Sequence, residues 1–419
     1  MSIGHGGAEF RFVDLFAGIG GFHLALESLG GECVLASEID ADCRTVYARR
    51  WPNTRLEGDI NSLTKDTSVI PEHDVLCAGF PCQPFSKSGF QRGLKDRTRG
   101  TLFYQIMEVI RARHPRFLFL ENVRNIAGPR HRDTWRVIID SLREEGYQVA
   151  DEPTVFSPHL LPPELGGTPQ VRERIFILAE HVGGNGAIRE PLFAKRPIDD
   201  WDPKRWRIET ILQPPEEVNS PERYALRPQE LTWLDAWEEF LQLVDEEPLP
   251  GFPIWADAFV AHPRIRRDTP EWKSDFLRKN SALYMRHRLE IDEWMERRAI
   301  LSFPPSRRKF EWQARGWDHT IWNLLIHLRP SGIRVKPPSY VPALVAITQT
   351  SIYGPLRRRL TPREVARLQG FPDDFPVHES DKVAYKQFGN AVAVGAVRYA
   401  AEKLMHAPRQ VAQEVLLAS

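Results

Sequence analysis

The sequence predicts an α/β fold with a mostly parallel sheet, combined with a second domain of less regular build. The first third of the chain alternates short β-branched or aromatic runs with amphipathic stretches, as repeated strand–helix–strand units do. From about residue 182 this pattern gives way to a region rich in Pro and Trp, and regular patterning returns near residue 360. We therefore expect a discontinuous first domain over residues 1–185 and 387–419, with residues 186–386 forming the second domain and a hinge.

The individual elements follow in the order that this fold requires. Strands are expected at residues 10–16, 33–38, 74–78, 117–120 and 174–179, and helices at 21–29, Leu102–Arg113 and 391–405. Thr361, Pro362 and Glu364 form the pattern of a helix start, in which Thr361 and Glu364 make a capping box. Gly370 is expected to end that helix.

Composition limits the class of protein. A chain of 419 residues with 42% hydrophobic content can fill the cores of two domains. No run of about 18 apolar residues exists, and the first residues lack the order of a signal peptide. We therefore expect a cytoplasmic protein with no membrane partner.

Cysteine and charge distribution narrow the chemistry. The four cysteines lie within the first 82 residues without the paired short spacings that hold zinc, so we expect no metal site and no disulfide framework. The formal net charge is zero, but basic residues prevail from Arg264 to Lys336. That stretch is the better candidate for phosphate contact.

A candidate nucleoside site begins at the first predicted strand, which runs into a glycine turn at residues 18–21. A dinucleotide fingerprint requires glycine at position 23, where this chain has His23, so the pattern favours a ligand without a pyrophosphate. Glu38 ends the next strand and can accept hydrogen bonds from both ribose hydroxyls. Asp59 is placed to accept one from an adenine amino group. The alternative is a structural glycine turn with two solvent-facing acids.

A candidate chemical site lies on the following strand ends. Cys82, between Pro81 and Pro84, follows an apolar strand, whereas Cys77 inside that strand fits a small buried hydrophobe. Glu121 ends the next strong strand. Arg172 and Arg174 lie two residues apart, so strand geometry puts them on one face, where they could depress the pKa of a thiol. A set of surface salt bridges is the alternative.

These residues belong to a series of motifs that resembles, in order, the DNA (cytosine-5) methyltransferases. The motifs are Phe16-Ala17-Gly18-Ile19-Gly20-Gly21, Pro81-Cys82-Gln83, Glu121-Asn122-Val123, Gln170-Val171-Arg172-Glu173-Arg174, Arg359-Leu360-Thr361-Pro362-Arg363-Glu364 with Gln369-Gly370-Phe371-Pro372, and Gly389-Asn390-Ala391-Val392. The resemblance implies a Rossmann-like S-adenosylmethionine-dependent methyltransferase domain with a smaller, irregular target-recognition domain at about residues 186–352.

The resemblance also implies a reaction. S-adenosylmethionine would give its methyl group to carbon 5 of a cytosine in duplex DNA, leaving S-adenosylhomocysteine. Cys82 would attack carbon 6, Glu121 would bind N3 and the amino group, Arg174 would hold the exocyclic oxygen, and Arg172 would support the loop. The cytosine would have to be flipped out of the duplex, at a cost of about a few kcal/mol.

The binding residues implied by the resemblance fall into two sets. Those for the cofactor are Phe16, Gly18, Ile19, Gly20, Glu38, Ile39, Asp59, Ile60, Pro81, Leu102, Asn390 and Val392; position 39, often Trp in relatives, is Ile here. For DNA, Ser86, Ser88, Arg92 and Lys95 belong to a loop expected to close as a lid. In the recognition region the candidates are Arg307, Arg308, Arg334 and Lys336, together with Arg264, Arg266, Arg267 and Lys309.

The tryptophans of that region are expected in its core rather than in stacks with bases. They are Trp233, Trp237, Trp255, Trp272, Trp294, Trp312, Trp317 and Trp322. The recognised DNA sequence cannot be read from them.

Partners follow from the resemblance as well. It implies a bacterial enzyme of the cytosol and nucleoid with double-stranded DNA as its substrate and a cognate restriction endonuclease acting separately. Monomeric action is expected, because one catalytic and one recognition domain can complete the reaction.

Three other functions compete with this interpretation. A related branch methylates transfer RNA and carries a later Cys-Phe-Thr signature, but this chain has no cysteine after Cys82. An inactive regulator is disfavoured by the intact Pro81–Cys82 pair and Glu121. A nucleotide-binding oxidoreductase is disfavoured by His23 and by the position of the thiol.

Overall fold

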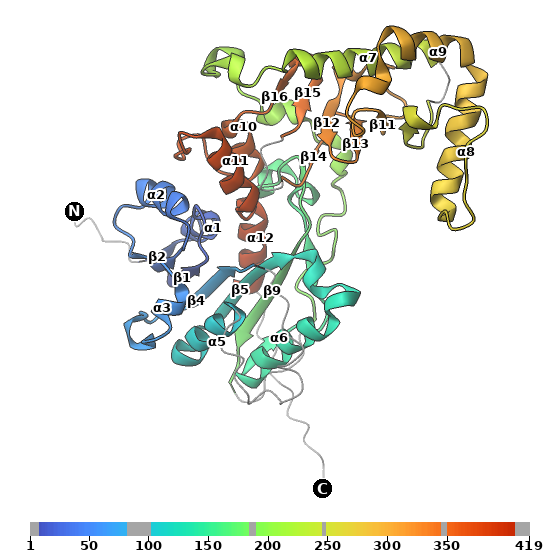
Figure 1. Ribbon diagram of the computed structural model, residues 1–419. Helices are drawn as coiled ribbons and strands as arrows, with labels where there is room; N and C mark the ends of the chain where they lie inside the picture. Colours follow the sequence, from blue (N-terminus) through green and yellow to red (C-terminus); the bar gives the residue numbers. More distant parts are fainter. Residues whose placement is uncertain (1–7, 82–101, 184–189, 245–248, 345–349, 407–419) are drawn as a thin grey trace. The chain divides into compact units, whose positions relative to one another are not determined.

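The computed structural model describes residues 8–81, 102–183, 190–244, 249–344 and 350–406 (Figure 1). Their contacts divide the chain into two compact units. Unit 1 comprises residues 1–206, 342–347 and 365–419, and unit 2 comprises residues 207–341 and 348–364. None of the helices in the described ranges has the length and apolar character needed to cross a membrane.

Unit 1 contains an eight-stranded sheet with the order β3-β2-β1-β4-β5-β9-β6, and β7 pairs with β9 beside this path. The strands are β1 (Phe10–Leu15), β2 (Gly31–Ser37), β3 (Leu56–Glu57), β4 (Val75–Gly79), β5 (Phe117–Val123), β6 (Tyr147–Val149), β7 (Thr154–Phe156) and β9 (Arg174–His181). The strand pairs β3–β2, β2–β1, β1–β4 and β4–β5 are parallel, whereas β9 pairs antiparallel with β5, β6 and β7. The predicted α/β class with a mostly parallel sheet is confirmed.

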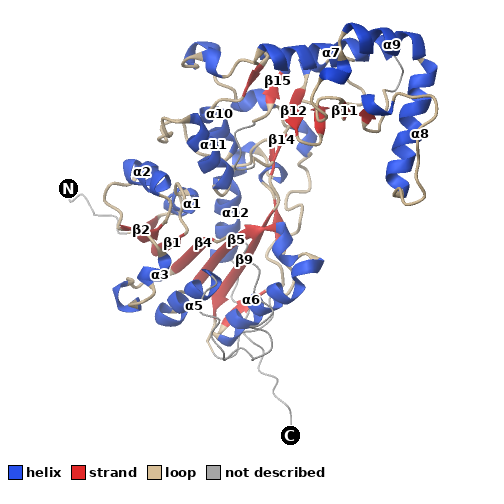
Figure 2. Cartoon of the chain, in the orientation of Figure 1, coloured by secondary structure: helices blue, strands red, loops and turns tan. Residues whose placement is uncertain are grey.

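Helices cover both faces of this sheet (Figure 2). The helices of unit 1 are α1 (Gly21–Glu27), α2 (Ala41–Arg50), α3 (Ile60–Leu63), α5 (Leu102–Arg113), α6 (Arg132–Glu144), α11 (Asp381–Asn390) and α12 (Val394–Met405), of which α1, α3, α5, α6 and α12 pack on the sheet. Apolar residues of α3, α5 and α6 share one core with Leu76, Leu118 and their neighbours in the sheet. Those of α1 and α12 share another with Phe119 and Phe176. The sheet is therefore buried on both faces, as parallel strands require.

The strand order places a crevice beside β1. The chain passes from β1 to β2 and β3 on one side and then returns to β4 and β5 on the other. Ligands of open α/β sheets bind outside the carboxyl ends of the strands where the order reverses in this way. The residues following β1 and β4 flank that position.

The predicted elements of unit 1 all form, with shifted ends. Helix α5 has its predicted bounds, and α12 starts at Val394 rather than at residue 391 because Ala391 and Ala393 are extended. Helices α2 and α6 were not predicted. Helix α2 is rich in arginine and polar residues, so apolar periodicity marks it weakly, whereas α6 is strongly amphipathic and was missed despite that signal.

Unit 2 is more regular than its sequence suggested. Its six-stranded sheet has the order β10-β11-β13-β12-β15-β16. The strands are β10 (Ile254–Trp255), β11 (Lys309–Trp312), β12 (Leu325–Arg329), β13 (Gly332–Lys336), β15 (Ile352–Tyr353) and β16 (Arg358–Arg359), and the helices are α7 (Pro228–Val244), α8 (Glu271–Arg286) and α9 (Arg288–Arg297). The remaining short strands are β8 (Gln170–Val171) in unit 1 and β14 (Val341–Pro342) at the boundary.

The tryptophans of unit 2 divide into core and surface residues. Trp237 stacks on Phe310 with ring centroids 5.1 Å apart, and Trp233, Trp294 and Trp312 share its buried core. Trp255 and Trp322 are half-buried. The prediction of a core position is wrong for Trp272 and Trp317, which are 60% and 41% exposed.

The predicted capping box forms at the start of α10 (Pro362–Leu368). The backbone N–H of Thr361 donates to Glu364 Oε2 at 2.8 Å, and that of Glu364 donates to Thr361 Oγ1 at 3.2 Å. Glu364 is fully buried and also accepts two hydrogen bonds from Arg358. Its carboxylate therefore neutralises a cation besides capping the helix.

We expect Glu364→Ala to lower the free energy of unfolding by roughly 3–5 kcal/mol, because it leaves the largely buried guanidinium of Arg358 unpaired. Urea denaturation followed by circular dichroism measures this loss. Glu293→Ala, which removes an exposed carboxylate 3.9 Å from Arg297, should change stability by less than about 1 kcal/mol. Equal losses for the two variants would contradict the assignment.

Candidate active site

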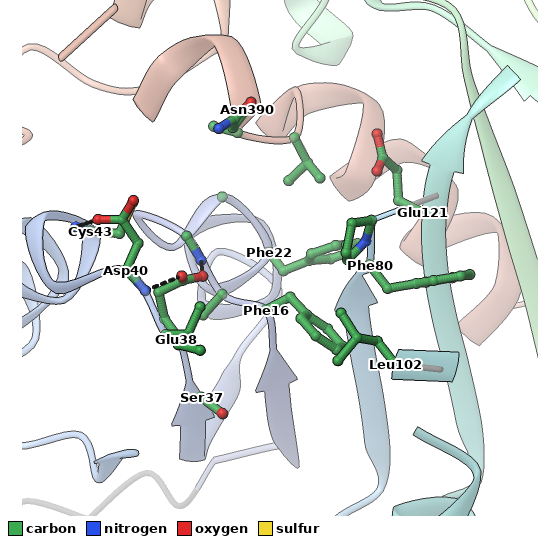
Figure 3. Close-up of a pocket in the computed structure, with 18 of the residues that line it drawn as sticks. Phe16, Phe22, Ser37, Glu38, Asp40, Cys43, Phe80, Leu102, Glu121 and Asn390 are labelled. Carbon is green, nitrogen blue, oxygen red and sulfur yellow. Dashed lines mark hydrogen bonds between the residues drawn. The ribbon is translucent and has the colours of Figure 1, made fainter. Parts of the chain in front are cut away.

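A cavity of about 540 Å³ opens at the carboxyl ends of the strands of unit 1 (Figure 3). The residues predicted from the sequence that line it are Phe16, Gly18, Glu38, Ile39, Asp59, Ile60, Pro81, Leu102, Glu121, Arg172, Arg174, Asn390 and Val392. Cys82, Ser86, Ser88, Arg92 and Lys95, with the predicted lid, lie outside the described residues. Ile19 and Gly20 are described but do not line the cavity.

The turn after β1 has the backbone geometry of a ligand-binding loop. Phe16 has φ +57°, a left-handed conformation that costs energy for an aromatic residue, and Gly18 has φ +57° with open space where a Cβ would be. Gly20 has φ +91°, and a Cβ there would lie 2.2 Å from the Trp51 ring. Ile19 is 1% exposed, so Ile19 and Gly20 support the conformation of the turn without lining the cavity.

Glu38 holds this turn in place. Its Oε2 accepts the backbone N–H of Gly18 at 2.8 Å, and its Oε1 accepts that of Asp40 at 2.8 Å (Figure 3). Each carboxylate oxygen can accept more than one hydrogen bond, so Glu38 keeps capacity for a ligand in the cavity.

Asp59 and Ile39 lie beside Glu38. Asp59 caps α3 by accepting the backbone N–H of Asn61 at 2.9 Å on Oδ1. Ile39 is 69% exposed on the cavity wall, although it is apolar. An exposed isoleucine beside two carboxylates is suited to contact a flat, apolar ligand face.

Several lining residues were missed by the sequence analysis. Lys386 of α11 forms an ion pair with Asp40 at 2.9 Å, which raises the pKa of the lysine. Only the fold brings these residues together, since they are 346 positions apart. Others that line the cavity without having been predicted are Phe22, Ser37, Cys43, Phe80, Asn122 and Gln387.

Glu121 and Arg174 form a buried ion pair at the end of β5. Arg174 Nε lies 3.0 Å from Glu121 Oε1, and the strands align Glu121 with Phe176. Burial raises the pKa of Glu121 above its ordinary value, while Arg174 and Arg172 act to lower it. A buried acid whose pKa is raised can hold a proton that an exposed one would lose.

Arg172 is mainly a support. It is 2% exposed, and its guanidinium donates to the carbonyl oxygens of Gly389 at 3.0 Å and Ala391 at 2.7 Å, with a longer bond to that of Leu344 at 3.3 Å. It thereby holds the segment that carries Asn390 and Val392 in the cavity wall. Arg172 was expected among the residues of the reaction as a support of the loop, and these contacts are those of a positioning residue.

Asn122 joins the end of β5 to the residues that precede Cys82. Its Nδ2 donates to the Phe80 carbonyl oxygen at 2.8 Å, and its Oδ1 accepts the backbone N–H of Val123 at 2.8 Å. Asn122 is 2% exposed. Asn122 belongs to the Glu-Asn-Val motif, so the sequence marked its position. The sequence did not indicate that its side chain would bind the Phe80 carbonyl oxygen.

The described cysteines are unsuited to act as nucleophiles. Burial raises the pKa of Cys43 to about 12 and that of Cys77 well above the ordinary thiol value. It raises the pKa of Cys33 as well. A thiol with a raised pKa supplies little thiolate near neutral pH. No cluster of metal-binding side chains occurs in the part of the chain that the structure describes.

Four of the basic residues predicted to contact DNA in unit 2 have partners within the protein. Arg307 is only 9% exposed and donates to the Arg329 carbonyl oxygen at 2.9 Å, so it is corrected to a structural residue. Arg308 pairs with Asp257 at 2.8 Å and Arg334 with Glu311 at 2.7 Å. Lys336 lies over the Tyr340 ring at 4.6 Å.

Comparison with known proteins identifies the family. Residues 10–406 match the model of the C-5 cytosine-specific DNA methylase family. The type II methyltransferase M.AluI of Cellulosimicrobium cellulans is 41% identical, over 94% of this chain and 91% of the relative. M.HhaI of Haemophilus parahaemolyticus is 32% identical, over 93% of each chain.

A solved structure shows the same fold at low identity. The crystal structure of the S. pombe Dnmt2 methyltransferase matches with a TM-score of 0.50 and 18% identity, covering 95% of this chain and 98% of that one. The resemblance inferred from the motifs is confirmed by the family match and the curated relatives. The chain belongs to the C-5 cytosine-specific DNA methylase family and is a DNA (cytosine-5) methyltransferase of the bacterial restriction–modification type.

Proposed function

We propose that the chain transfers a methyl group from S-adenosylmethionine to carbon 5 of a flipped cytosine in duplex DNA, through a covalent adduct with Cys82. The observation that carries this proposal is one cavity with two chemically different ends. Figure 3 shows Glu38 at one end and Glu121 at the other. Ile39 follows Glu38 in the sequence and lines the same cavity, as does Asp59, and Arg174 pairs with Glu121. An adenosyl group and a pyrimidine ring need these two environments side by side.

The first end fits an adenosyl group. Glu38 can accept hydrogen bonds from ribose hydroxyls while it holds Gly18, and Asp59 can accept one from the adenine amino group. Ile39 and Phe16 provide apolar contact with the adenine, and the absence of a side chain at Gly18 lets the ligand approach the backbone. The cofactor supplies an electrophilic methyl group.

The second end fits cytosine. The thiolate of Cys82 forms a bond to carbon 6 as the electrons of the 5,6 double bond shift toward N3, which takes a proton from Glu121, so that carbon 5 becomes the nucleophilic carbon of an enamine. Arg174 donates to the exocyclic oxygen. After carbon 5 has taken the methyl group, a base removes the carbon 5 proton, the bond between carbon 6 and Cys82 breaks, and the N3 proton returns to Glu121, which restores the aromatic ring.

The nucleophile is assigned to Cys82 because the other cysteines are unsuited to the role. Cys33, Cys43 and Cys77 have pKa values raised by burial. Asn122 anchors Phe80, two residues before Cys82, to the strand that carries Glu121. This tether fixes the residues that precede Cys82 beside the strand end that carries Glu121.

Methyl transfer from tritiated S-adenosylmethionine to plasmid DNA, followed by bisulfite sequencing, tests the proposal. Label on cytosine at one short recurring sequence is the expected result. Label on transfer RNA, or on adenine, or no label with a folded protein, would reject it.

We expect Glu38→Gln to raise KM for S-adenosylmethionine at least about tenfold, since charge-assisted hydrogen bonds contribute roughly 1.5–3 kcal/mol. kcat should change little, because the ribose lies away from the reacting carbon. Glu57→Gln is the matched control, because Glu57 pairs with Arg55 at the surface and does not line the cavity. An unchanged KM in the Glu38 variant would place the ribose elsewhere.

The cellular setting follows from the relatives named type II methyltransferases. We propose that the chain acts as a monomer on DNA in the bacterial cytosol, alongside a separate restriction endonuclease that cuts the same sequence. Sedimentation velocity tests the monomer, and a dimer at assay concentrations would contradict it. Protection of methylated plasmid from the endonuclease tests the pairing.

A further inference from the structure

The end of the cavity that carries Glu38, here called the adenosyl end, has walls from two distant parts of the sequence. Glu38 and Asp40 follow β2, whereas Lys386 and Asn390 belong to α11 (Figure 3). All four residues line the cavity. Lys386 Nζ lies 2.9 Å from Asp40 Oδ2, so one ion pair joins the two walls directly.

This ion pair lies at the rim of the cavity. The side chains of Lys386 and Asp40 are 53% and 32% exposed, although both residues line the cavity. Their mutual hydrogen bond raises the pKa of Lys386 and lowers that of Asp40, so both are charged near neutral pH. Because the pair is open to water, a substitution that breaks it leaves no buried charge without a partner.

Asp40 connects the pair to the carboxylate that is suited to the ribose. Its backbone N–H donates to Glu38 Oε1 at 2.8 Å. Its own Oδ1 accepts the backbone N–H groups of Asp42 at 3.0 Å and Cys43 at 3.3 Å, which caps α2. Lys386 therefore acts on Glu38 through one intervening residue that is already fixed to a helix.

Helix α11 is held at two points. Arg172 donates to the carbonyl oxygen of Gly389 at 3.0 Å, three residues after Lys386. Loss of the contact between Lys386 and Asp40 would leave α11 attached to Arg172 but would remove its ion pair with the Glu38 wall. The contact thus bears on the relative position of the two walls.

Other contacts keep α2 and the segment before α11 together without that pair. Arg49 pairs with Glu379 at 3.5 Å, and His378 Nε2 lies 3.9 Å from Asp42 Oδ1. None of these four residues lines the cavity. A substitution at Lys386 is therefore expected to loosen the rim without separating the elements.

We propose that Lys386 and Asp40, here called the rim pair, hold the two walls together around bound S-adenosylmethionine and slow its release. The inference rests on the proposed function and adds positioning residues to it. A contact that preserves the bound arrangement of a site lowers the dissociation rate more than it raises the association rate. The product carries the same adenosyl group, so its release should be slowed in the same way.

The test is Lys386→Met in the full chain, because methionine keeps an unbranched apolar side chain and removes the charge. Isothermal titration calorimetry without DNA gives Kd for S-adenosylmethionine, and chase of bound tritiated S-adenosylmethionine with unlabelled ligand gives the release rate. We expect both to rise about two- to fivefold, the range for a partly exposed ion pair. KM should rise with Kd, while kcat at saturating cofactor stays within about twofold.

Two further variants separate the ion pair from a general disturbance. Lys386→Arg should keep Kd near the wild-type value, because a guanidinium can also pair with Asp40. Asp40→Asn removes the charge and keeps the cap of α2, since Asn and Asp cap helices equally well. In the Asp40→Asn background, Lys386→Met should raise Kd no further, as expected for two residues that act through one contact.

Arg398→Met is the matched control. It breaks the exposed ion pair of Arg398 with Glu402, at 3.0 Å on α12, in the same unit but away from the cavity lining. Its Kd should equal that of the wild type. Unchanged melting temperatures establish that the variants remain folded.

The outcomes separate the inference from the function. An unchanged Kd for Lys386→Met, an equal rise for Lys386→Arg or Arg398→Met, or additive effects of Lys386→Met and Asp40→Asn would overturn the rim pair while wild-type binding stands. If the wild type bound no S-adenosylmethionine, the proposed function and the rim pair would both fail.

Discussion

Replacement of Cys82 by alanine is expected to reduce methyl transfer by at least about 10⁴-fold, the order of loss seen when a covalent nucleophile is removed. Without the thiolate, no bond forms at carbon 6, and carbon 5 of cytosine stays a poor nucleophile. Binding of S-adenosylmethionine and DNA should persist, because the variant removes only a sulfur atom. Tritium transfer to DNA gives the rate, and equilibrium binding gives the affinities.

Cys33→Ala is the matched control for this substitution. Cys33 is half-buried and outside the cavity, so its removal should leave kcat within about twofold. A second readout uses DNA in which the target cytosine carries fluorine at carbon 5. Because fluorine cannot leave as a cation, the wild type should stay covalently attached to this DNA, whereas Cys82→Ala should not. Full activity of Cys82→Ala would refute covalent catalysis by this residue.

Glu121→Gln is expected to lower kcat by roughly 10²–10⁴-fold, the range for loss of a general acid. The amide keeps the shape of the side chain and can still meet N3, but it cannot give up a proton to it. It also leaves Arg174 without its carboxylate partner, 3.0 Å away in the wild type. Single-turnover kinetics measure the chemical step directly.

Glu180→Gln provides a control for the loss of a carboxylate from the same strand pair. Glu180 is 3% exposed, pairs with Arg116 at 3.2 Å and lies opposite Phe117, at the other end of β5 and β9. We expect it to lower stability without lowering kcat of the folded fraction. If both variants lost activity in proportion to stability, Glu121 would have no chemical role.

Much of unit 1 could be predicted because its strands are continuous apolar runs. Residues 117–120, for example, are apolar and fully buried in the sheet, and such a run leaves a clear trace in the sequence. The carboxyl ends of neighbouring parallel strands lie at one edge of the sheet, so polar residues at these ends are expected to lie close together. Glu38, Asp59 and Glu121 were found for this reason, together with the motif resemblance.

What could not be predicted depends on partners that are distant in sequence. Lys386 meets Asp40, and Arg172 meets Gly389 and Ala391, only after the chain has folded. The basic residues of unit 2 show the same limitation. Sequence marks Arg307 and Arg266 as equal cations, although the fold buries the first and leaves the second exposed.

The contact between Arg172 and the segment at residues 389–391 has a consequence for shortened chains. The cavity wall at Asn390 and Val392 belongs to a segment made more than 200 residues after the guanidinium that holds it. A chain that lacks this segment therefore has neither the cavity wall at Asn390 and Val392 nor the two carbonyl partners of the Arg172 guanidinium. Loss of the segment would remove one side of the site for the methyl donor even if every strand of the sheet were formed.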